Sequence, residues 1–422
     1  MNTISKILSV ENSTINGKIR LSGAKNSALK LQTISLLTDE EVYFTNFPNG
    51  LSDVIIHNEM LKVLGKSVDI DEDNLKVSGE INKNELIWDG RSIRNTLLIW
   101  GAILARKGIS KVPLPGGCKI GERKYDLHQM VLEKLGAKVW VEGDYLCAES
   151  KGGLVGSDIH LPLRSTGATE NAVISSCLAK GKTTIWNPHV RPEVIELINV
   201  LNKMGANIEV RGNESIIVEG VEKLRGATHN VMPDNMEALT YLVAAAITGG
   251  EIEIEGFPYE HLEVPMIFLE SSGLKVYQGP NSIITKESNC YPLEISTGPY
   301  PGINSDMQPI LAVFAACAKG MSKIVDLRFP DRFGYAEQLS KMGVSTDVVN
   351  NQLVINGGNP LVGAHVYADD LRAGAALLLA GLVAEGVTLI SNAEQIERGY
   401  ENFIEKLQSL GARVCWQETE NI

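Results

Sequence analysis

The chain has 422 residues, of which 44% are hydrophobic and 21% charged, a composition typical of a globular protein with room for more than one core. Its 39 Lys and Arg against 51 Asp and Glu give a net charge of −12, which argues against binding to nucleic acid or to an anionic membrane. The N-terminus lacks the apolar run of a signal peptide, and the longest uncharged apolar run, residues 373–384, is too short to span a bilayer.

The chain repeats one pattern about every 70 residues. A helical pattern ends six times in apolar-Gly-x-x-apolar, at Gly65, Gly136, Gly205, Gly273, Gly343 and Gly411. A second signature, a helix that ends in a glycine and is followed by a strand, recurs at 105–112, 178–185, 248–254, 318–324 and 384–390. In the first repeat, residues 38–44 stand at this point without the glycine. Six repeats therefore fill the chain.

Each repeat predicts a strand, a helix, a strand, a helix and two short strands. In the sixth repeat these elements are residues 365–368, 371–386, 387–392, 399–411 and 412–417. The first helix of a repeat is apolar on nearly every face, as in 27–37 and 96–105, so we expect it to be buried. The second is amphipathic, as in 126–136, and should lie outside. Six such repeats predict layered α/β domains that divide three and three, with a ligand cleft between the halves.

Cations recur at equivalent points of the repeats. Lys25, Arg94 and Arg372 stand at the N-termini of first helices, where a cation opposes the helix dipole unless an anion is also present. Ser305 and Asp370 also stand at the N-termini of first helices, and we expect them to cap these helices. Near the starts of second helices the repeats place Arg123, Arg332 and Arg398. A single Arg is usually a solvated surface charge. Six cations at repeat-equivalent positions instead favour an anion-binding cleft for phosphate and carboxylate groups.

The six cysteines and seven histidines form no CxxC pair and no metal-binding cluster, which predicts a cytoplasmic protein with reduced thiols and no metal. The chain also lacks GxGxxG and GxxxxGK[ST], the usual dinucleotide and P-loop motifs. Five cysteines are expected to be core thiols, with Cys177 and Cys317 in apolar helices. Cys118 differs because it lies in the glycine-rich segment 114–123, where thiolate or general-acid chemistry is feasible.

Several motifs carry a family resemblance. GAKNSAL, LPGGCKIGERKYDLH, STGATENA, PDNMEA, SDMQ, DRF, DLRAGAALLLAG and ERGYENF resemble, in register over nearly the whole chain, the UDP-N-acetylglucosamine enolpyruvyl transferases (1-carboxyvinyltransferases). The related shikimate-phosphate enolpyruvyl transferases share the six-repeat fold but lack the Cys loop. The resemblance implies two inside-out α/β domains, each a pseudo-threefold of βαβαββ units. It places residues 22–231 in one domain and residues 1–21 with 232–422 in the other, with the active site in the cleft between them.

The resemblance implies transfer of enolpyruvyl from phosphoenolpyruvate to the 3-hydroxyl of UDP-N-acetylglucosamine, the first dedicated step of peptidoglycan synthesis, with release of phosphate and without a cofactor. Cys118 matches the general acid and Asp306 the base, with Lys25 and Arg398 also catalytic. The expected phosphoenolpyruvate-binding cations are Lys25, Arg94, Arg123, Arg332, Arg372 and Arg398. The expected acceptor-binding residues are Asn26, Arg123, Lys124, Tyr125, Asp126, Leu127, Arg164, Ser165, Thr166, Gly167 and Asp306.

The chain departs from the family pattern beside the acceptor site. Lys124-Tyr125-Asp126 stands where the family has Pro-x-Asp, and Asn304-Ser305 where it has Pro-Thr. PDRF, DDLR and ERGY replace ENRF, TDLR and DRGY, and Arg94-Asn95-Thr96 falls in the family's MRAS. None of these changes removes an expected catalytic residue. A paralogue that acts on another nucleotide or sugar nucleotide in secondary metabolism is therefore an alternative, and a non-catalytic nucleotide-sugar binder is a further one.

Overall fold

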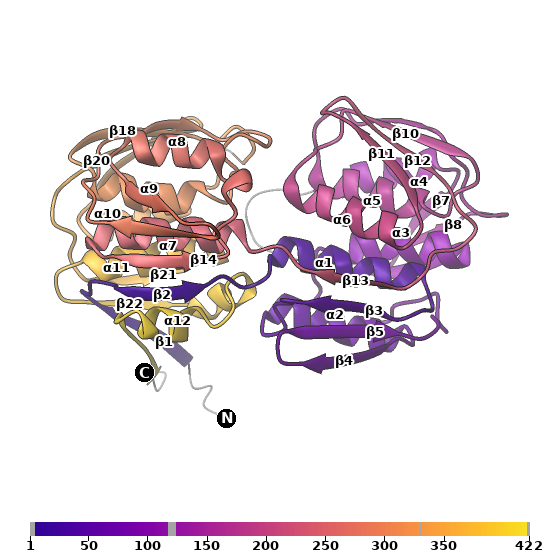
Figure 1. The fold of residues 1–422 in the computed structure, drawn as a ribbon, viewed down its shortest axis with the longest axis horizontal. Coiled ribbons are helices and arrows are strands. Elements are labelled where there is room, and N and C mark those ends of the chain that lie inside the picture. The colour runs from indigo at the N-terminus through magenta and orange to yellow at the C-terminus, as the bar shows by residue number, and fades with distance from the viewer. Residues whose placement is uncertain (1–4, 117–123, 330, 420–422) are drawn as a thin grey trace. The chain divides into compact units, whose positions relative to one another are not determined.

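The computed structural model describes residues 5–116, 124–329 and 331–419, which form two compact units (Figure 1). We call residues 23–116 with 124–232 the central unit and residues 5–22 with 233–419 the terminal unit. Each unit has its own hydrophobic core. Over the described ranges, no helix is both long and apolar enough to cross a bilayer.

Two helices of each predicted repeat are present. The helices of the central unit are α1 (Lys25–Ile34), η1 (Ser35–Leu37), α2 (Ser52–Val63), α3 (Thr96–Lys107), α4 (Asp126–Lys134), α5 (Thr166–Ser176) and α6 (Pro192–Lys203). Those of the terminal unit are α7 (Asn235–Thr248), η2 (Tyr259–His261), α8 (Glu263–Ser271), α9 (Gln308–Cys317), α10 (Gly334–Lys341), α11 (Leu371–Val383), η3 (Ala393–Arg398) and α12 (Phe403–Ser409).

The strands are short. Those of the central unit are β3 (Val42–Thr45), β4 (Ser67–Asp71), β5 (Asn74–Ser78), β6 (Ile109–Pro113), β7 (Lys138–Glu142), β8 (Tyr145–Glu149), β9 (Asp158–His160), β10 (Lys182–Trp186), β11 (Asn207–Arg211), β12 (Ser215–Glu219) and β13 (Ala227–Asn230). Those of the terminal unit are β1 (Ser5–Glu11), β2 (Gly17–Arg20), β14 (Ile252–Glu255), β15 (Lys275–Gln278), β16 (Ser282–Lys286), β17 (Glu294–Ser296), β18 (Gly320–Val325), β19 (Ser345–Val349), β20 (Gln352–Gly357), β21 (His365–Tyr367), β22 (Val387–Ser391) and β23 (Arg413–Thr419).

Within the described residues, each unit carries three small sheets. Those of the central unit have the strand orders β13-β3-β5-β4, β6-β8-β7 and β11-β12-β10-β9. Those of the terminal unit are β15-β16-β14-β2, β17-β18-β20-β19 and β21-β22-β1-β23. The predicted six-repeat α/β fold is therefore confirmed. The prediction of a first strand in the second repeat is wrong. The segment between β5 and α3 makes one isolated parallel bridge, from Glu85 to Lys111, and it contains Asp89 and Gly90, which are unfavourable in strands.

The first and fourth repeats exchange their first strands. β2, from the start of the first repeat, pairs in parallel with β14, and Ile19 lies opposite Ile254. β13, from the start of the fourth repeat, pairs in parallel with β3. β1 lies between β22 and β23, so the N-terminal strand completes the sheet of the last repeat. The period of the sequence is thus preserved, although the chain passes between the units at residues 22–23 and 232–233.

The buried and outer helices follow the predicted division. α3 buries nine of its twelve residues, whereas α4 buries three of nine. In the terminal unit α7, α9 and α11 pack against one another (Figure 1). The six glycines that mark the repeat all have a positive φ, between 88° and 106°. This left-handed conformation ends the second helix of each repeat and explains why glycine recurs there.

Candidate active site

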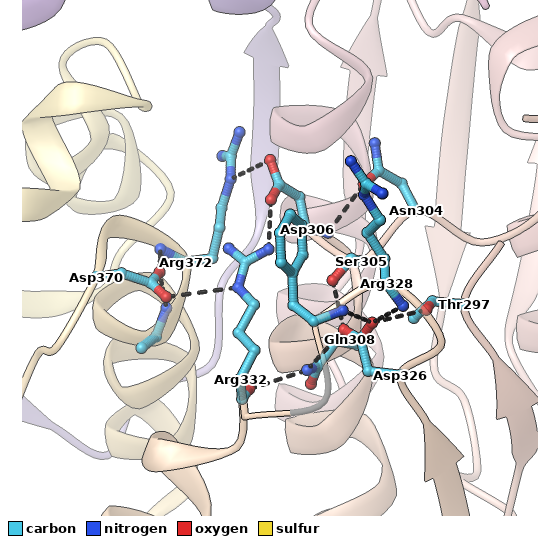
Figure 2. A network of polar contacts seen from close by, with 12 residues as sticks. Thr297, Asn304, Ser305, Asp306, Gln308, Asp326, Arg328, Arg332, Asp370 and Arg372 are labelled. Carbon is cyan, nitrogen blue, oxygen red and sulfur yellow. Dashed lines mark hydrogen bonds and ion pairs between the residues drawn. The ribbon is translucent and has the colours of Figure 1, made fainter. Parts of the chain in front are cut away.

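In the terminal unit, the Asp306 carboxylate is held between two buried guanidinium groups (Figure 2). Arg332 Nη1 donates to Asp306 Oδ1 at 2.6 Å, and Arg372 Nε lies 3.7 Å from Oδ2. The side chains of Arg332 and Arg372 are 5% and 2% exposed, while that of Asp306 is 27% exposed. Asp306 therefore combines a fixed position with access for a small polar group.

Neighbouring groups keep both arginines charged. Burial lowers the pKa of the Arg332 guanidinium, but the carboxylates of Asp306 and Asp370 outweigh this effect and raise the pKa above its ordinary value. Burial also lowers the pKa of Arg372, and Tyr400 and Asp306 outweigh it. The Arg372 guanidinium lies over the Tyr400 ring, 4.9 Å from its centroid, where the ring face favours a cation. Both side chains remain available as cations.

A carboxylate of the terminal unit, Asp370, stands at the start of α11. Asp370 Oδ1 accepts hydrogen bonds from the backbone N–H of Arg372 (2.6 Å) and Ala373 (3.0 Å), so Asp370 is the predicted cap. Its Oδ2 lies 3.6 Å from Arg332 Nε. The prediction that Ser305 caps a helix is wrong. α9 begins three residues later, and the Ser305 hydroxyl instead donates to the buried Asp326 carboxylate.

Arg398 belongs to the same unit and ends η3. It is 7% exposed, and its Nη1 donates to Gln395 Oε1 at 3.0 Å. The terminal unit thus carries four of the predicted site residues, and ion pairs join Asp306, Arg332 and Arg372 into one cluster.

In the central unit, Lys25 shares a carboxylate with a residue that the sequence analysis missed. Lys25 is the first residue of α1 and is 8% exposed, and its Nζ lies 3.0 Å from Asp53 Oδ2. Arg91 Nη2 donates to the other oxygen of Asp53 at 2.8 Å and lies 3.4 Å from the Ser52 hydroxyl. Asp53 is buried in the first turn of α2, whereas Arg91 is 43% exposed. One buried carboxylate therefore orients two cations.

The predicted acceptor segments of the central unit lie close together. A Cβ built on Gly167, in the first turn of α5, would lie 2.9 Å from the His128 ring of α4. The starts of α4 and α5 therefore approach closely, which brings residues 124–127 near 164–167. Arg94 Nη2 donates to the Lys124 carbonyl at 2.8 Å. Arg94, which is predicted to bind phosphoenolpyruvate, is thus hydrogen-bonded to residues 124–127, which are predicted to bind the acceptor.

The side chains around the start of α5 are already fixed. The Ser165 hydroxyl caps α5 by accepting from the Ala168 N–H at 3.4 Å, and Thr166 Oγ1 lies 2.8 Å from His189 Nδ1. Arg164 is exposed, and its Nε donates to Asn187 Oδ1 at 3.3 Å.

Asn26, the remaining predicted acceptor contact, is half-buried in the first turn of α1. Lys124 and Asp126 are exposed, and Tyr125 and Leu127 are half-buried.

Two predicted residues, Cys118 and Arg123, lie outside the described residues. The other five cysteines differ in exposure, although all five were predicted to be core thiols. Cys147 and Cys177 are buried, Cys290 and Cys317 are half-buried, and Cys415 is exposed on β23. Cys415 contradicts the prediction of a core thiol, because it alternates with the buried Val414 on a strand with one solvent face. Burial raises the pKa of Cys177 and of Cys317 to about 12, as expected for inert thiols.

Comparison with known proteins assigns the family. The family model described as EPSP synthase (3-phosphoshikimate 1-carboxyvinyltransferase) matches residues 10–407. The chain is 40% identical over 402 residues to UDP-N-acetylglucosamine 1-carboxyvinyltransferase 1 of Caldanaerobacter subterraneus subsp. tengcongensis, covering 95% of this chain and 96% of the relative. The chain belongs to the enolpyruvyl transferase family. Another relative, UDP-N-acetylglucosamine 1-carboxyvinyltransferase of Gluconacetobacter diazotrophicus, is 40% identical over 95% of this chain and 96% of its own.

Solved structures of enolpyruvyl transferases share the fold. The enolpyruvyl transferase NikO from Streptomyces tendae superposes with a TM-score of 0.90 at 24% identity, covering 99% of this chain and 100% of that one. EPSP synthase from Acinetobacter baumannii gives a TM-score of 0.73 at 19% identity, covering 98% and 100%. At these identities the likeness concerns the fold alone. As a member of the family, the protein is a 1-carboxyvinyltransferase, an enzyme that moves an enolpyruvyl group from phosphoenolpyruvate to an acceptor hydroxyl.

In this enolpyruvyl transferase, the residues around Lys25 that the sequence analysis missed are Asp53 and Arg91. Asp53 stands in the first turn of a second helix, as Glu193 does in the third repeat, where it pairs with Arg191 at 2.6 Å. An acid at this repeat position was therefore a usable signal for Asp53. Arg91 carried no such signal, because its distance from Asp53 along the chain follows no period of the repeat.

Proposed function

We propose that the protein transfers the enolpyruvyl group of phosphoenolpyruvate to the 3-hydroxyl of UDP-N-acetylglucosamine and releases phosphate, the first dedicated step toward peptidoglycan precursors. The identity of 40% over 95% of the chain to relatives named for this acceptor supports the choice of substrate. The observation that carries the chemistry is the accessible Asp306 carboxylate, held in place by the buried Arg332 and Arg372.

The proposed reaction is an addition followed by an elimination. Cys118 gives a proton to C3 of phosphoenolpyruvate, and the acceptor oxygen bonds to C2 while Asp306 takes the hydroxyl proton. The product of this step is a tetrahedral ketal that still carries the phosphate. Cleavage of the C2–O bond to phosphate, with loss of a proton from C3, restores the double bond and releases inorganic phosphate. The Cys118 thiolate takes back a proton from C3, and the departing phosphate receives the proton held by Asp306, so both side chains return to their starting state.

The cations neutralise the substrate and the charge that develops during the reaction. We propose that Lys25, Arg94 and Arg123 act with Arg332, Arg372 and Arg398 on the same phosphoenolpyruvate molecule. In the structure Lys25 and Arg332 already pair with Asp53 and Asp306. An incoming phosphate or carboxylate therefore has to share these cations with the protein's own carboxylates, and binding energy is used to rearrange the pairs.

For the acceptor, we propose a nucleotide site built from residues 123–127, residues 164–167 and Asn26. The close approach of α4 and α5 at Gly167 supports a single site for the two segments. The exposed Arg164 and Lys124 provide positive charge for a diphosphate. Asp306 is proposed to contact the sugar hydroxyl that reacts.

A paralogue that acts on another nucleotide or sugar nucleotide is the second candidate. The observation that favours it is Lys124-Tyr125, which differs from the family's proline at the proposed acceptor site and whose Lys124 carbonyl accepts from Arg94. A non-catalytic nucleotide-sugar binder is a weaker candidate, because a binder needs neither an acid at position 118 nor a base at position 306.

A panel of acceptors tests the proposal. The purified protein is incubated with phosphoenolpyruvate and, in separate reactions, with UDP-N-acetylglucosamine, UMP, other uridine nucleotides and shikimate 3-phosphate, and released phosphate is measured. We expect release with UDP-N-acetylglucosamine, and none without an acceptor. Release with UMP or another nucleotide alone would identify the paralogue, and no release with any acceptor would favour the binder.

A further inference from the structure

Beneath Asp306 lies a second carboxylate, Asp326, to which no role has yet been assigned (Figure 2). Asp326 follows the last residue of β18 and is 0% exposed. Its Oδ1 accepts from the Thr297 hydroxyl at 3.0 Å and from the backbone N–H of Arg328 and Phe329, both at 2.8 Å. Its Oδ2 accepts from the Ser305 hydroxyl and, at 3.3 Å, from Gln308 Nε2. The carboxylate is thus surrounded by donors.

The partners of the buried Asp326 carboxylate in the described part of the chain are neutral hydrogen-bond donors. Across residues 5–116, 124–329 and 331–419, no Lys, Arg or His side chain lies within ion-pair distance of it. A buried carboxylate is costly unless hydrogen bonds replace its water. Here neutral donors do so, and they come from three separate segments: the end of β17, the turn before α9 and the loop after β18. Their common acceptor fixes these segments relative to one another.

Two of these connections lead directly to the proposed site. Ser305 precedes Asp306, so the bond from its hydroxyl to Asp326 holds the turn that presents the Asp306 carboxylate. Gln308 Nε2 also donates to the backbone carbonyl of Arg332, at 3.0 Å. The other end of the Gln308 amide accepts from the Tyr335 hydroxyl, which orients the amide. Asp326 therefore reaches Asp306 through one residue and the backbone of Arg332 through another.

We propose that Asp326 is a positioning residue, which sets the Asp306 carboxylate against the Arg332 guanidinium by holding Ser305 directly and the Arg332 backbone through Gln308. The proposal rests on the proposed function, in which Asp306 is the base. The 2.6 Å bond between Asp306 and Arg332 is the quantity that Asp326 controls. Since a displacement of about 1 Å can lower a rate roughly 100-fold, such control is important for turnover.

Asp326→Asn is the variant that tests this, and Thr297→Val is its matched control. Asp326→Asn replaces the oxygen that accepts from Ser305 and Gln308 by an amide nitrogen that cannot accept from them. Thr297→Val removes one donor to Asp326 and the acceptor of the Leu327 N–H in the same buried network, but Thr297 lies on neither connection to Asp306 or Arg332. We expect Asp326→Asn to lower kcat about 10- to 100-fold, and Thr297→Val to stay within about twofold of wild type once both are corrected for the folded fraction. Ser305→Thr, which keeps the hydroxyl, should retain kcat.

A double variant distinguishes positioning from general damage. Ser305→Ala should lower kcat alone, but adding it to Asp326→Asn should lower kcat no further, because Ser305 acts on the site through its bond to Asp326. Equal kcat for Asp326→Asn and Thr297→Val, or additive effects in the double variant, would overturn the proposal.

Crystal structures of wild type, Asp326→Asn and Thr297→Val give a readout that needs no turnover. We expect the distance from Arg332 Nη1 to Asp306 Oδ1 to increase in Asp326→Asn only. If wild type releases no phosphate with any acceptor, the proposed function fails, and this distance alone decides whether Asp326 positions the pair. An unchanged distance in Asp326→Asn would then overturn the inference.

Discussion

Replacing Asp306 by Asn should move affinity for phosphoenolpyruvate and turnover in opposite directions. The carboxylate occupies Arg332 at 2.6 Å and lies 3.7 Å from Arg372, and both arginines are proposed to bind the substrate's anionic groups. Asp306→Asn removes the charge with which the substrate competes, so phosphoenolpyruvate should bind more tightly. The same substitution removes the proposed base, so turnover should fall.

The size of each effect follows from the geometry. A hydrogen bond between charged groups contributes about 1.5–3 kcal/mol. Asp306 is 27% exposed, and Asp370 lies 3.6 Å from Arg332 Nε and takes up part of its charge, so we discount the gain to about 1 kcal/mol. This corresponds to roughly fivefold tighter binding. Loss of a general base lowers turnover about 10²- to 10⁴-fold.

Titration calorimetry with phosphoenolpyruvate measures the affinity, and phosphate release with a saturating acceptor measures turnover. Asp347→Asn is the control, because it makes the same change of charge at an exposed position of β19. The control should leave both quantities within about twofold of wild type. Weaker binding of phosphoenolpyruvate by Asp306→Asn, or turnover within tenfold of wild type, would refute the reasoning.

Three further predictions concern the thiol, the acceptor site and acid stability. Cys118→Ser should lower phosphate release at least about 100-fold with an unchanged circular dichroism spectrum, and wild-type rates would remove Cys118 from the mechanism. Gly167→Ala places a Cβ 2.9 Å from the His128 ring, so the KM for the acceptor should rise several-fold, whereas Gly298→Ala, with no atom within 4 Å of the new Cβ, should not change it. Burial, reinforced by Lys30, lowers the pKa of His57 to about 3, so between pH 6.5 and 3 the unfolded chain binds a proton that the folded chain does not. Wild type should therefore lose about 2 kcal/mol more unfolding free energy than His57→Leu between pH 7 and pH 5 in urea titrations; equal losses would contradict this.

The fold was predictable to the extent that each repeat satisfies its own local requirements. A glycine that must adopt a positive φ at the end of a helix leaves a mark at a fixed place, and Gly65 and its five equivalents all do so. The exchange of β2 and β13 left no such mark. β2 pairs in parallel with β14, and β13 pairs in parallel with β3. Because β3 and β14 stand at equivalent positions of their repeats, the period of the sequence does not determine which of them β2 or β13 joins.

In the site, the cations were predictable and the ion pairs that they form were not. Lys25 and Arg372 are conspicuous because a cation at the start of a buried helix requires an anion, and Arg332 because cations recur near the starts of the second helices. The anions nearest to them in the structure belong to the protein, namely Asp53, Asp306 and Asp370. Resemblance assigned only Asp306 a role in the reaction, and the roles of the other two depend on tertiary packing.

This pairing changes what the repeated cations imply about binding. Around Arg332 and Arg372, the carboxylates of Asp306 and Asp370 provide as many negative charges as the arginines provide positive ones. The cluster is therefore stable without a ligand, and a substrate anion gains only the difference between its own interactions and those it displaces. Such a site binds an anion strongly when the anion brings several charges at the correct spacing, as a phosphate and a carboxylate on one small molecule do. We therefore expect the internal carboxylates to disfavour single anions, and we expect Asp306→Asn to relax this selectivity.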